Sequence, residues 1–366
     1  MANAYLDDRA DISPSTLFSL LGLVLLGTRF VQGFIFWGGA SRRLFYSHAE
    51  VDGVDLALKL DFDSAGFVAN KLVHALPGTL WIQAPLEWTL QFPALIVASV
   101  WFWTFAELAV GLGLIFGLLT RAAALASIGL NIALMLIFGW MGSTCLDEWT
   151  MAVSGVAMSS AVFLAGGGGA SLDTLVGRTD WAWRNPWTNW LFSGPVPTGA
   201  LRGWATALAV VSVVFTVGTY HVLFGAVVTP LHPRVNYHKH DVALSDVTAS
   251  ADGAVRFVAY VDAGPDTGAA YVVAAKLVDR SGKTVAEWDG AALAALPASA
   301  FDNVYPYVWA SKFKAEKVGF SGVTGAKATI TLPAPAGTTI PAGGSYDLTL
   351  EAIDGSVWKS AVPASR

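Results

Sequence analysis

Charged side chains are what this sequence has least of. Asp, Glu, Lys and Arg together make up 13% of its 366 residues, whereas a soluble domain carries about 25%. Hydrophobic residues account for 54%, and long stretches before residue 228 have almost no charge. The composition therefore excludes a wholly soluble protein. It predicts a membrane-embedded part followed by a part of ordinary soluble character.

Cysteine is nearly absent as well. Cys145 is the single cysteine, which excludes an internal disulfide framework and any centre that needs several thiolates, such as an iron–sulfur cluster. The sequence has no c-type haem attachment motif and no Rossmann fingerprint, so we expect neither haem nor flavin. The net charge is −5 and no basic tract occurs, so we expect no nucleic-acid partner.

Five apolar segments are each long enough to cross a lipid bilayer, which takes about 20 residues. They are residues 15–38, 91–119, 121–141, 149–167 and 202–226. Lys and Arg in the short loops favour an N-terminus inside and a C-terminal region outside. We therefore expect a multi-pass helical bundle in the cytoplasmic (inner) membrane. The "GGGG" at 166–169 lacks the Lys-Ser/Thr of a phosphate loop, and we expect it to be a flexible exit from the fourth span.

The chain outside the spans has two patterns. Within the long 40–90 segment, "DSAGFVANKLVHAL" and "LEWTLQF" indicate short amphipathic helices on the outer surface. From about residue 236 the pattern has a period of two, as in "VRFVAYVDA" and "YDLTLEAID", which predicts an immunoglobulin-like β-sandwich. The predicted organisation is a transmembrane bundle with a four-helix core over 1–190, a fifth transmembrane helix and linker over 191–235, and an extracytoplasmic β-sandwich over 236–366.

Three polar side chains lie inside the predicted spans, where each needs a partner: Arg29, Glu107 and Asn131. Counting about 1.5 Å per residue from the tryptophans at the membrane face puts Arg29 and Glu107 at a similar depth, which predicts a buried ion pair. One interpretation is that this pair only fixes the helix register. The other is a headgroup pocket for a lipid-soluble redox carrier, completed by Asn131, Trp103 and Trp140, in which Glu107 supplies or accepts a proton.

Reactive side chains concentrate at the outer rim of the predicted bundle. Arg42 and Arg43 follow the first span, and two adjacent guanidiniums facing outward suit a small oxyanion; the alternative is a pair of snorkelling membrane anchors. Cys145 precedes the fourth helix, where the helix N-terminus lowers the pKa of a thiol and the carboxylates of Asp147 and Glu148 raise it. The alternatives are a catalytic thiol and a small hydrophobe beside a helix cap.

A histidine-rich stretch, "HPRVNYHKHD" at 232–241, joins the fifth span to the sandwich. It contains Arg234, His238 and His240, and the two histidines point the same way if this stretch is a strand. Histidine is a frequent metal ligand, but no clear carboxylate or thiolate completes a set. We therefore expect a polar linker that docks the sandwich, without a metal.

Three stretches of the sequence resemble known families. "GFIFWGGASRR" and "GWMGSTCLDEWTM" resemble DoxD, and the "NYHKHDVAL" that opens the sandwich resembles DoxA. These are the two small-subunit families of thiosulfate:quinone oxidoreductase, fused here into one DoxDA-type chain, with DoxD over about 15–190 and DoxA over about 230–366. The resemblance implies oxidation of thiosulfate to tetrathionate, with two electrons passed to a membrane quinone as co-substrate.

The residues fit that reaction in ways that can be tested. Two thiosulfate dianions must approach each other, so the site needs cations; the candidates are Arg42, Arg43, Arg234, His238 and His240. Either Cys145 carries one thiosulfate as a mixed disulfide that the second attacks, or sulfur adds to the quinone ring. In both routes the proton donors to the reduced quinone are taken from Glu107, Asp147 and Glu148.

Two other classes of function remain open at this point. One is a transporter or receptor for a small sulfur anion, and the other is a non-catalytic membrane subunit of a redox complex. The sequence has no sign of an inverted repeat or of a pair of broken helices, which counts against transport. Aromatic-rich spans with packing glycines make a homodimer a reasonable expectation.

Overall fold

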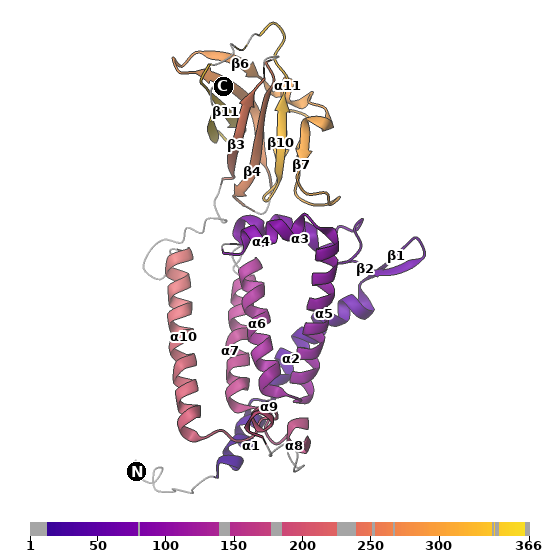
Figure 1. The fold of residues 1–366 in the computed structure, drawn as a ribbon, viewed down its shortest axis with the longest axis vertical. Coiled ribbons are helices and arrows are strands. Elements are labelled where there is room, and N and C mark those ends of the chain that lie inside the picture. Colours follow the sequence, from indigo (N-terminus) through magenta and orange to yellow (C-terminus); the bar gives the residue numbers. More distant parts are fainter. Residues whose placement is uncertain are drawn as a thin grey trace. The chain divides into compact units, whose positions relative to one another are not determined.

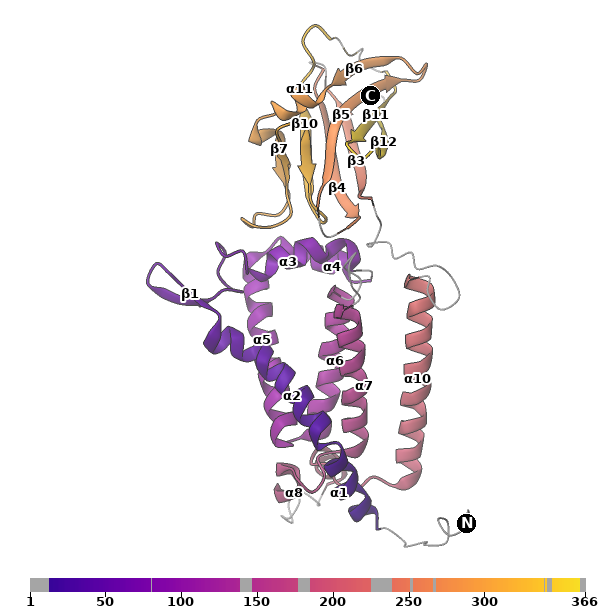
Figure 2. The ribbon, with the colours of Figure 1, turned by 180° about the vertical axis from the view of Figure 1, so that it is seen from behind.

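Two compact units make up the chain (Figures 1 and 2). The computed structural model describes residues 13–79, 81–138, 147–176, 185–224, 239–250, 253–265, 268–338, 340 and 344–362. Unit 1 comprises Met1–His48, Trp101–Leu134 and Thr150–Thr219, and unit 2 comprises Ala49–Val100, Met135–Trp149 and Tyr220–Arg366. The predicted combination of an apolar helical part with a C-terminal β-rich part is confirmed.

The regular elements of the described part of unit 1 are helices, apart from His48 at the start of β1. Of these helices, α5 and α7 begin in unit 2, and α6 and α10 end there. Their bounds are α1 Pro14–Val24, α2 Leu26–Ser41, the π-helix η1 Arg42–Tyr46, α5 Pro93–Phe116, α6 Thr120–Phe138, α7 Asp147–Ala165, α8 Leu172–Val176, α9 Pro186–Leu191 and α10 Thr198–Phe224.

Within the described residues, three helices are long and apolar enough to cross a membrane: α5, α6 and residues Thr198–Thr219 of α10. Residues Ser15–Val24 and Leu26–Tyr46 pass the same test only together, as a pair bent by 56°. The apolar part of α7, Trp149–Ala165, is shorter than these. The predicted total of five spans therefore stays a prediction, while the positions of the apolar helices agree with the sequence.

Helices α2 and α5 touch backbone to backbone. A Cβ atom placed on Gly33 of α2 would lie 2.8 Å from the amide nitrogen of Ile115, and one on Gly111 of α5 would lie 2.8 Å from that of Trp37. Such distances leave no space for a side chain at either glycine. Small residues at crossings of membrane helices permit this close approach, and here it fixes which faces of α2 and α5 meet.

A buried polar layer joins the helix ends at the α6–α7 side of unit 1. Arg121 is fully buried and donates to three backbone carbonyls, which are those of Phe163, Trp190 and Gly194. Asp173 accepts the backbone N–H of Thr120 at 3.0 Å, at the start of α6. A cation near helix C-termini and a carboxylate at a helix N-terminus both oppose the helix dipole, so this layer stabilises the bundle.

The four-glycine segment after α7 is part of this layer. The amide of Gly167 donates to Ser193 Oγ at 3.0 Å, and the carbonyl of Gly168 accepts from Ser171 Oγ at 2.7 Å. Gly168 also packs directly on the backbone of Gly22 in α1, where a Cβ on either residue would overlap the other. The expected flexible exit is therefore wrong, because the missing side chains allow a hydrogen-bonded turn to contact α1.

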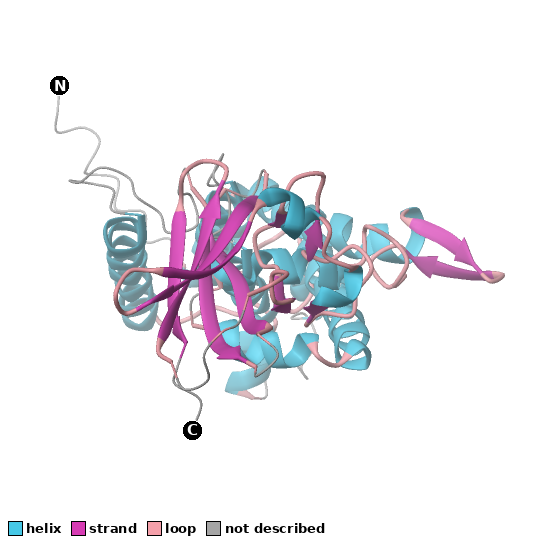
Figure 3. Cartoon of the chain, turned by 90° about the horizontal axis from the view of Figure 1, so that it is seen from above, coloured by secondary structure: helices cyan, strands magenta, loops and turns pink. Residues whose placement is uncertain are grey.

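Two antiparallel sheets surround the core of the β-rich part of unit 2. The first has the order β3 (Asp241–Ala249), β4 (Val255–Ala263), β10 (Lys327–Leu332), β7 (Phe301–Asn303). The second has the order β12 (Val357–Val362), β11 (Tyr346–Ala352), β5 (Ala270–Asp279), β9 (Phe320–Gly322), β8 (Phe313–Ala315), and β6 (Thr284–Trp288) also pairs with β5. Figure 3 shows these strands from above.

Alternating burial explains why these residues form strands. Along β10 every second side chain is buried, and Ile330 lies opposite Phe257 of β4 in the first sheet. In the second sheet Leu348 lies opposite Leu277. All four side chains are fully buried in one core, as a two-sheet packing requires. The immunoglobulin-like topology stays a prediction.

The remaining elements lie in the 49–100 segment, where β1 begins one residue earlier, and in a short stretch of the β-rich part that contains α11 and η4. They are the hairpin β1 (His48–Val51) and β2 (Val54–Ala57), the helices α3 (Val68–Ala75) and α4 (Gln83–Leu90), the 3-10 turns η2 (Leu76–Gly78) and η4 (Ala298–Ala300), and α11 (Gly290–Ala294). We call α3, η2, α4 and the residues between them the deck. Its two helices correspond to the short helices that the sequence predicts in this segment.

Candidate functional site

A buried ion pair lies where α2 passes into the π-helix η1. Arg43 of η1 pairs through Nη2 with Oε2 of Glu107 on α5, and each side chain is only 9% exposed. Arg43 Nε also donates to Thr104 Oγ1 at 2.6 Å. Single π-helical turns are frequent at functional sites because they turn a side chain out of the regular helical register. Here the π-turn accompanies an arginine directed at α5.

The second carboxylate oxygen of Glu107 is occupied as well. Trp103, one helical turn earlier on α5, donates its indole N–H to Oε1 at 2.7 Å. Gly39 of α2 leaves room for this carboxylate, because a Cβ there would lie 3.0 Å from Glu107 Cδ. We call Arg43, Trp103, Thr104 and Glu107 the Arg43 cluster. His48 borders it, with Nε2 at 2.8 Å from the backbone oxygen of Arg43.

The chemistry available to the Arg43 cluster follows from its groups. The guanidinium carries N–H donors of the kind that suits a ligand carbonyl, and Glu107, which the Trp103 indole N–H holds in place, can exchange a proton. Ionisable groups inside a membrane protein are costly and are usually retained for function. The residues that the structure describes include no group of three or more His, Cys, Asp or Glu side chains that could hold a metal ion.

The predicted pair between Arg29 and Glu107 is wrong. Arg29 donates instead to the backbone oxygens of Gly167 at 2.8 Å and Ala170 at 2.7 Å, in the turn after α7. The prediction assumed that the first span ends near residue 38. The helix in fact continues through η1 to Tyr46. Arg43 lies about 21 Å further along this helix than Arg29, at about 1.5 Å per residue. Arg43 is therefore the arginine that reaches Glu107.

The two adjacent arginines do not face the same way. Arg43 is buried in the cluster, whereas Arg42 is exposed and donates Nε to the backbone oxygen of Gly38 at 3.2 Å. The prediction that both guanidiniums point outward is therefore wrong for Arg43. Consecutive residues of a helix lie about 100° apart around its axis, so a helical backbone at this point separates them.

Asn131 belongs to a second buried polar group in unit 1. Its Nδ2 donates to the backbone oxygen of Ser127 at 2.8 Å. Ser127 Oγ in turn lies 2.7 Å from Ser159 Oγ of α7 and accepts from Gln32 Nε2 of α2 at 3.1 Å. These bonds tie α2, α6 and α7 together. Asn131 Nδ2 thus donates to Ser127, which is not a member of the Arg43 cluster.

Several predicted site residues lie outside the described part of the chain. They are Cys145, Trp140, Arg234 and His238; Asp147 and Glu148 open α7, but their side chains are likewise not described. His240 is described, and its Nε2 lies 3.1 Å from the backbone oxygen of Pro265. Burial lowers the pKa of His240 below its usual value, which weakens the prediction that a protonated His240 attracts an anion at neutral pH.

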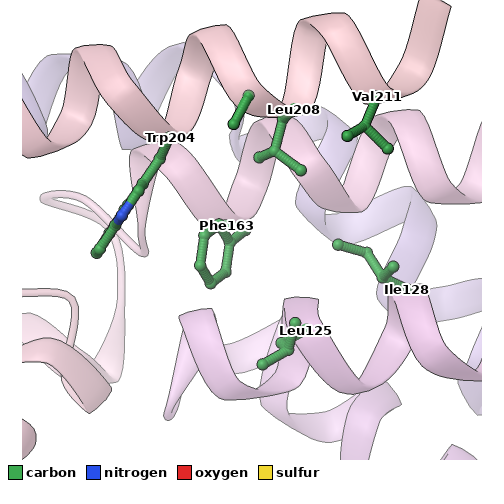
Figure 4. A pocket seen from close by; sticks show the side chains of 7 residues that line it. Leu125, Ile128, Phe163, Trp204, Leu208 and Val211 are labelled. Atoms are coloured by element: carbon green, nitrogen blue, oxygen red, sulfur yellow. The ribbon is translucent and has the colours of Figure 1, made fainter. Parts of the chain in front are cut away.

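An apolar cavity of about 290 Å³ lies between α6, α7 and α10 in unit 1 (Figure 4). Its walls are hydrophobic and aromatic side chains, namely Leu125, Ile128, Phe163, Trp204, Ala207, Leu208 and Val211. Such a lining suits a lipid acyl chain or an isoprenoid tail. It offers almost no polar group for a headgroup, so the Arg43 cluster remains the candidate site of chemistry.

Thr104, Gly39 and His48 are the site residues that sequence reasoning missed. Thr104 lies three residues before Glu107 on one helical face, which is a readable signal. Nothing in the sequence indicates that Gly39 faces Glu107. His48 had no signal, because its contact is with a backbone oxygen.

Comparison with known proteins gives two family matches. Residues 27–199 match the model of the DoxD family, described as "TQO small subunit DoxD", and residues 223–361 match "TQO small subunit DoxA". Among solved structures, one from the Iho670 flagellar-like filament aligns over 46% of this chain and 99% of that chain, with 10% identity and a TM-score of 0.22; a likeness that low carries no argument. The chain therefore belongs to the small-subunit families of thiosulfate:quinone oxidoreductase, with a DoxD part followed by a DoxA part.

Proposed function

We propose that this membrane protein oxidises thiosulfate to tetrathionate and reduces a membrane quinone. Two thiosulfate dianions form one S–S bond and lose two electrons. The quinone takes up these two electrons and two protons, which gives a quinol. The observation that carries the proposal is the presence of both small-subunit families of this oxidoreductase in one chain.

The quinone headgroup is proposed to bind at the Arg43 cluster. A quinone carbonyl needs a hydrogen-bond donor and its reduction needs a proton source, and the cluster contains both kinds of group within one buried site. Glu107 holds or moves a proton, Trp103 orients its carboxylate, and Arg43 orients the carboxylate and the headgroup. Because Arg43 is buried beside Glu107, we assign it to the quinone rather than to thiosulfate.

Thiosulfate is proposed to bind at the solvent side, where Arg42 is exposed. Arg234, His238, His240 and the Cys145 segment remain candidates for this part of the reaction. A Cys145→Ser chain that keeps full turnover would eliminate the mixed-disulfide route and leave sulfur addition to the quinone. We further propose that the chain crosses the inner membrane several times, with its C-terminal part outside, and that it forms a homodimer.

The test is quinone reduction by the detergent-purified full chain, with and without thiosulfate. A Glu107→Gln variant should lose most of the thiosulfate-dependent rate, because the amide cannot carry a proton; general acid–base catalysis is typically worth about 10²–10⁴-fold. Glu50→Gln is the matched control, since Glu50 is exposed on β1. Equal rates for the two variants would remove Glu107 from the reaction, and a wild-type chain without activity would favour transport or a missing partner.

A further inference from the structure

Helix α10 has little contact with the rest of unit 1. None of the residues in its most apolar 18-residue stretch is buried, whereas 33% are buried in the corresponding stretches of α5 and α6. A Cβ atom placed on Gly199, Gly203 or Gly218 would meet nothing within 4 Å beyond its own turns of helix. Because α10 is apolar and long enough to cross a membrane, bilayer lipid covers the exposed faces of this helix.

The apolar cavity lies between α10 and the pair α6 and α7 (Figure 4). At one end the rings of Phe163 and Trp204 lie 5.8 Å apart. From Trp204 the lining continues through Leu208 to Val211, which is about 10 Å further along α10 at 1.5 Å per residue. The volume of about 290 Å³ is at the lower end of the range for ligand pockets, about 300–1,000 Å³. The cavity therefore suits a single hydrocarbon chain rather than a headgroup together with its tail.

This cavity lies within one leaflet of the membrane. Its lining comes from the start of α6, the end of α7 and the start of α10, and these helix ends meet where Arg121 donates to the Phe163 carbonyl. Val211 lies about 20 Å from the start of α10, which is half of a bilayer about 40 Å thick. Trp204 is therefore the lining residue of α10 nearest to the membrane surface, where tryptophan is enriched because its ring is apolar and its indole N–H is polar.

We propose that the cavity binds one acyl chain of a phospholipid, with the ester groups of that lipid beside the Trp204 indole, and that this chain fills the contact between α10 and the bundle. A quinone at the Arg43 cluster does not supply the chain, because α6 and α7 stand between α5 and α10 (Figures 1 and 2). Almost all of α10 lies between the two family matches, at residues 27–199 and 223–361. The phospholipid thus holds the helix that joins the DoxD part to the DoxA part. The assignment is independent of the proposed reaction.

The experiment measures which lipid stays with the full chain. The chain is purified in detergent and washed free of bulk lipid, and its bound phospholipid and quinone are quantified by mass spectrometry. We expect the wild type to retain phospholipid in an amount equal to the chain. Ala207→Phe places a ring in the cavity and should lower the retained phospholipid at least about tenfold, since excluding two methylene groups already costs about that factor in affinity. Ile128→Trp, from the α6 wall, should do the same.

Ala209→Phe is the matched control, because it makes the same change at an exposed position of α10 that does not line the cavity. A second measurement adds phosphatidylglycerol to lipid-stripped protein. The thermal midpoint of the wild type and of Ala209→Phe should rise, whereas that of Ala207→Phe should not change. The two cavity-filling variants lie on different helices, so misfolding of one leaves the other to decide.

Three results would overturn the proposal. The first is a wild-type chain that retains no phospholipid and whose thermal midpoint does not respond to phosphatidylglycerol. The second is equal retention of phospholipid by the cavity-filling variants and by Ala209→Phe. The third is quinone, in place of phospholipid, retained by the wild type and lost from Ala207→Phe, which would assign the cavity to an isoprenoid tail.

Discussion

Removing one partner of the Arg43–Glu107 pair should cost much more stability than removing both. The two side chains are each 9% exposed, so Glu107→Leu leaves the Arg43 charge buried without its carboxylate, and Arg43→Met does the converse. Breaking a buried ion pair in this way costs about 3–5 kcal/mol, whereas replacing both members by apolar residues is often neutral or stabilising. The double variant should therefore unfold near the wild-type free energy.

The assay is a double-mutant cycle on the free energy of unfolding in detergent, with quinone reduction measured on the same four proteins. The partly exposed pair Lys276–Glu351, at 2.9 Å with side chains 29% and 37% exposed, is the control and should give less than about 1 kcal/mol. We expect the double variant at the cluster to regain stability without regaining activity. The reasoning is refuted if the losses of unfolding free energy in the two single variants add up in the double variant, or if each single loss is as small as in the control pair. A double variant that regains full quinone reduction would show that the pair is purely structural.

Three further perturbations test other parts of the account. Asp173→Ala removes the acceptor that caps α6 and should lower the free energy of unfolding by about 2 kcal/mol; an unchanged thermal midpoint would contradict this. Arg29→Lys should cost about 1–3 kcal/mol through lost carbonyl hydrogen bonds but leave the quinone KM unchanged, and a raised KM at full stability would return Arg29 to the quinone site. Burial lowers the pKa of His240 in the folded chain, so the unfolded chain binds a proton there first as the pH falls below about 6.5. The free energy of unfolding of the wild type should therefore fall in this range, and that of His240→Gln should fall less. Free energies of unfolding that change in parallel for the two proteins between pH 7 and 5 would contradict this.

The sequence predicted the helices and strands better than the contacts that their side chains make with one another. The apolar runs that became α5, α6 and α10 follow directly from hydropathy, and the alternating pattern of β10 from the pleat of a strand. Glu107 and Trp103 were found because polar and aromatic residues in a span are conspicuous. Arg43 was missed as the partner of Glu107, because the length of an apolar segment cannot show that α2 continues as a π-helix through Tyr46.

Contacts between distant segments were also beyond a single sequence. The four glycines after α7 indicated flexibility, yet their missing side chains admit α1 and a set of hydrogen bonds. Likewise, Tyr307 appears in the sequence as an ordinary loop residue, and only the fold brings its hydroxyl to Leu90. Such pairings depend on loop closure over long separations, for which local pattern carries no signal.

The most direct test of the central claim is the stoichiometry of the reaction catalysed by the purified full chain. Thiosulfate consumed, tetrathionate formed and quinol formed are measured together under conditions without oxygen. The account predicts two thiosulfates consumed for each tetrathionate and each quinol, with quinol formation lost in Glu107→Gln. Quinol formed without tetrathionate, or no thiosulfate-dependent quinol from a folded chain, would contradict it.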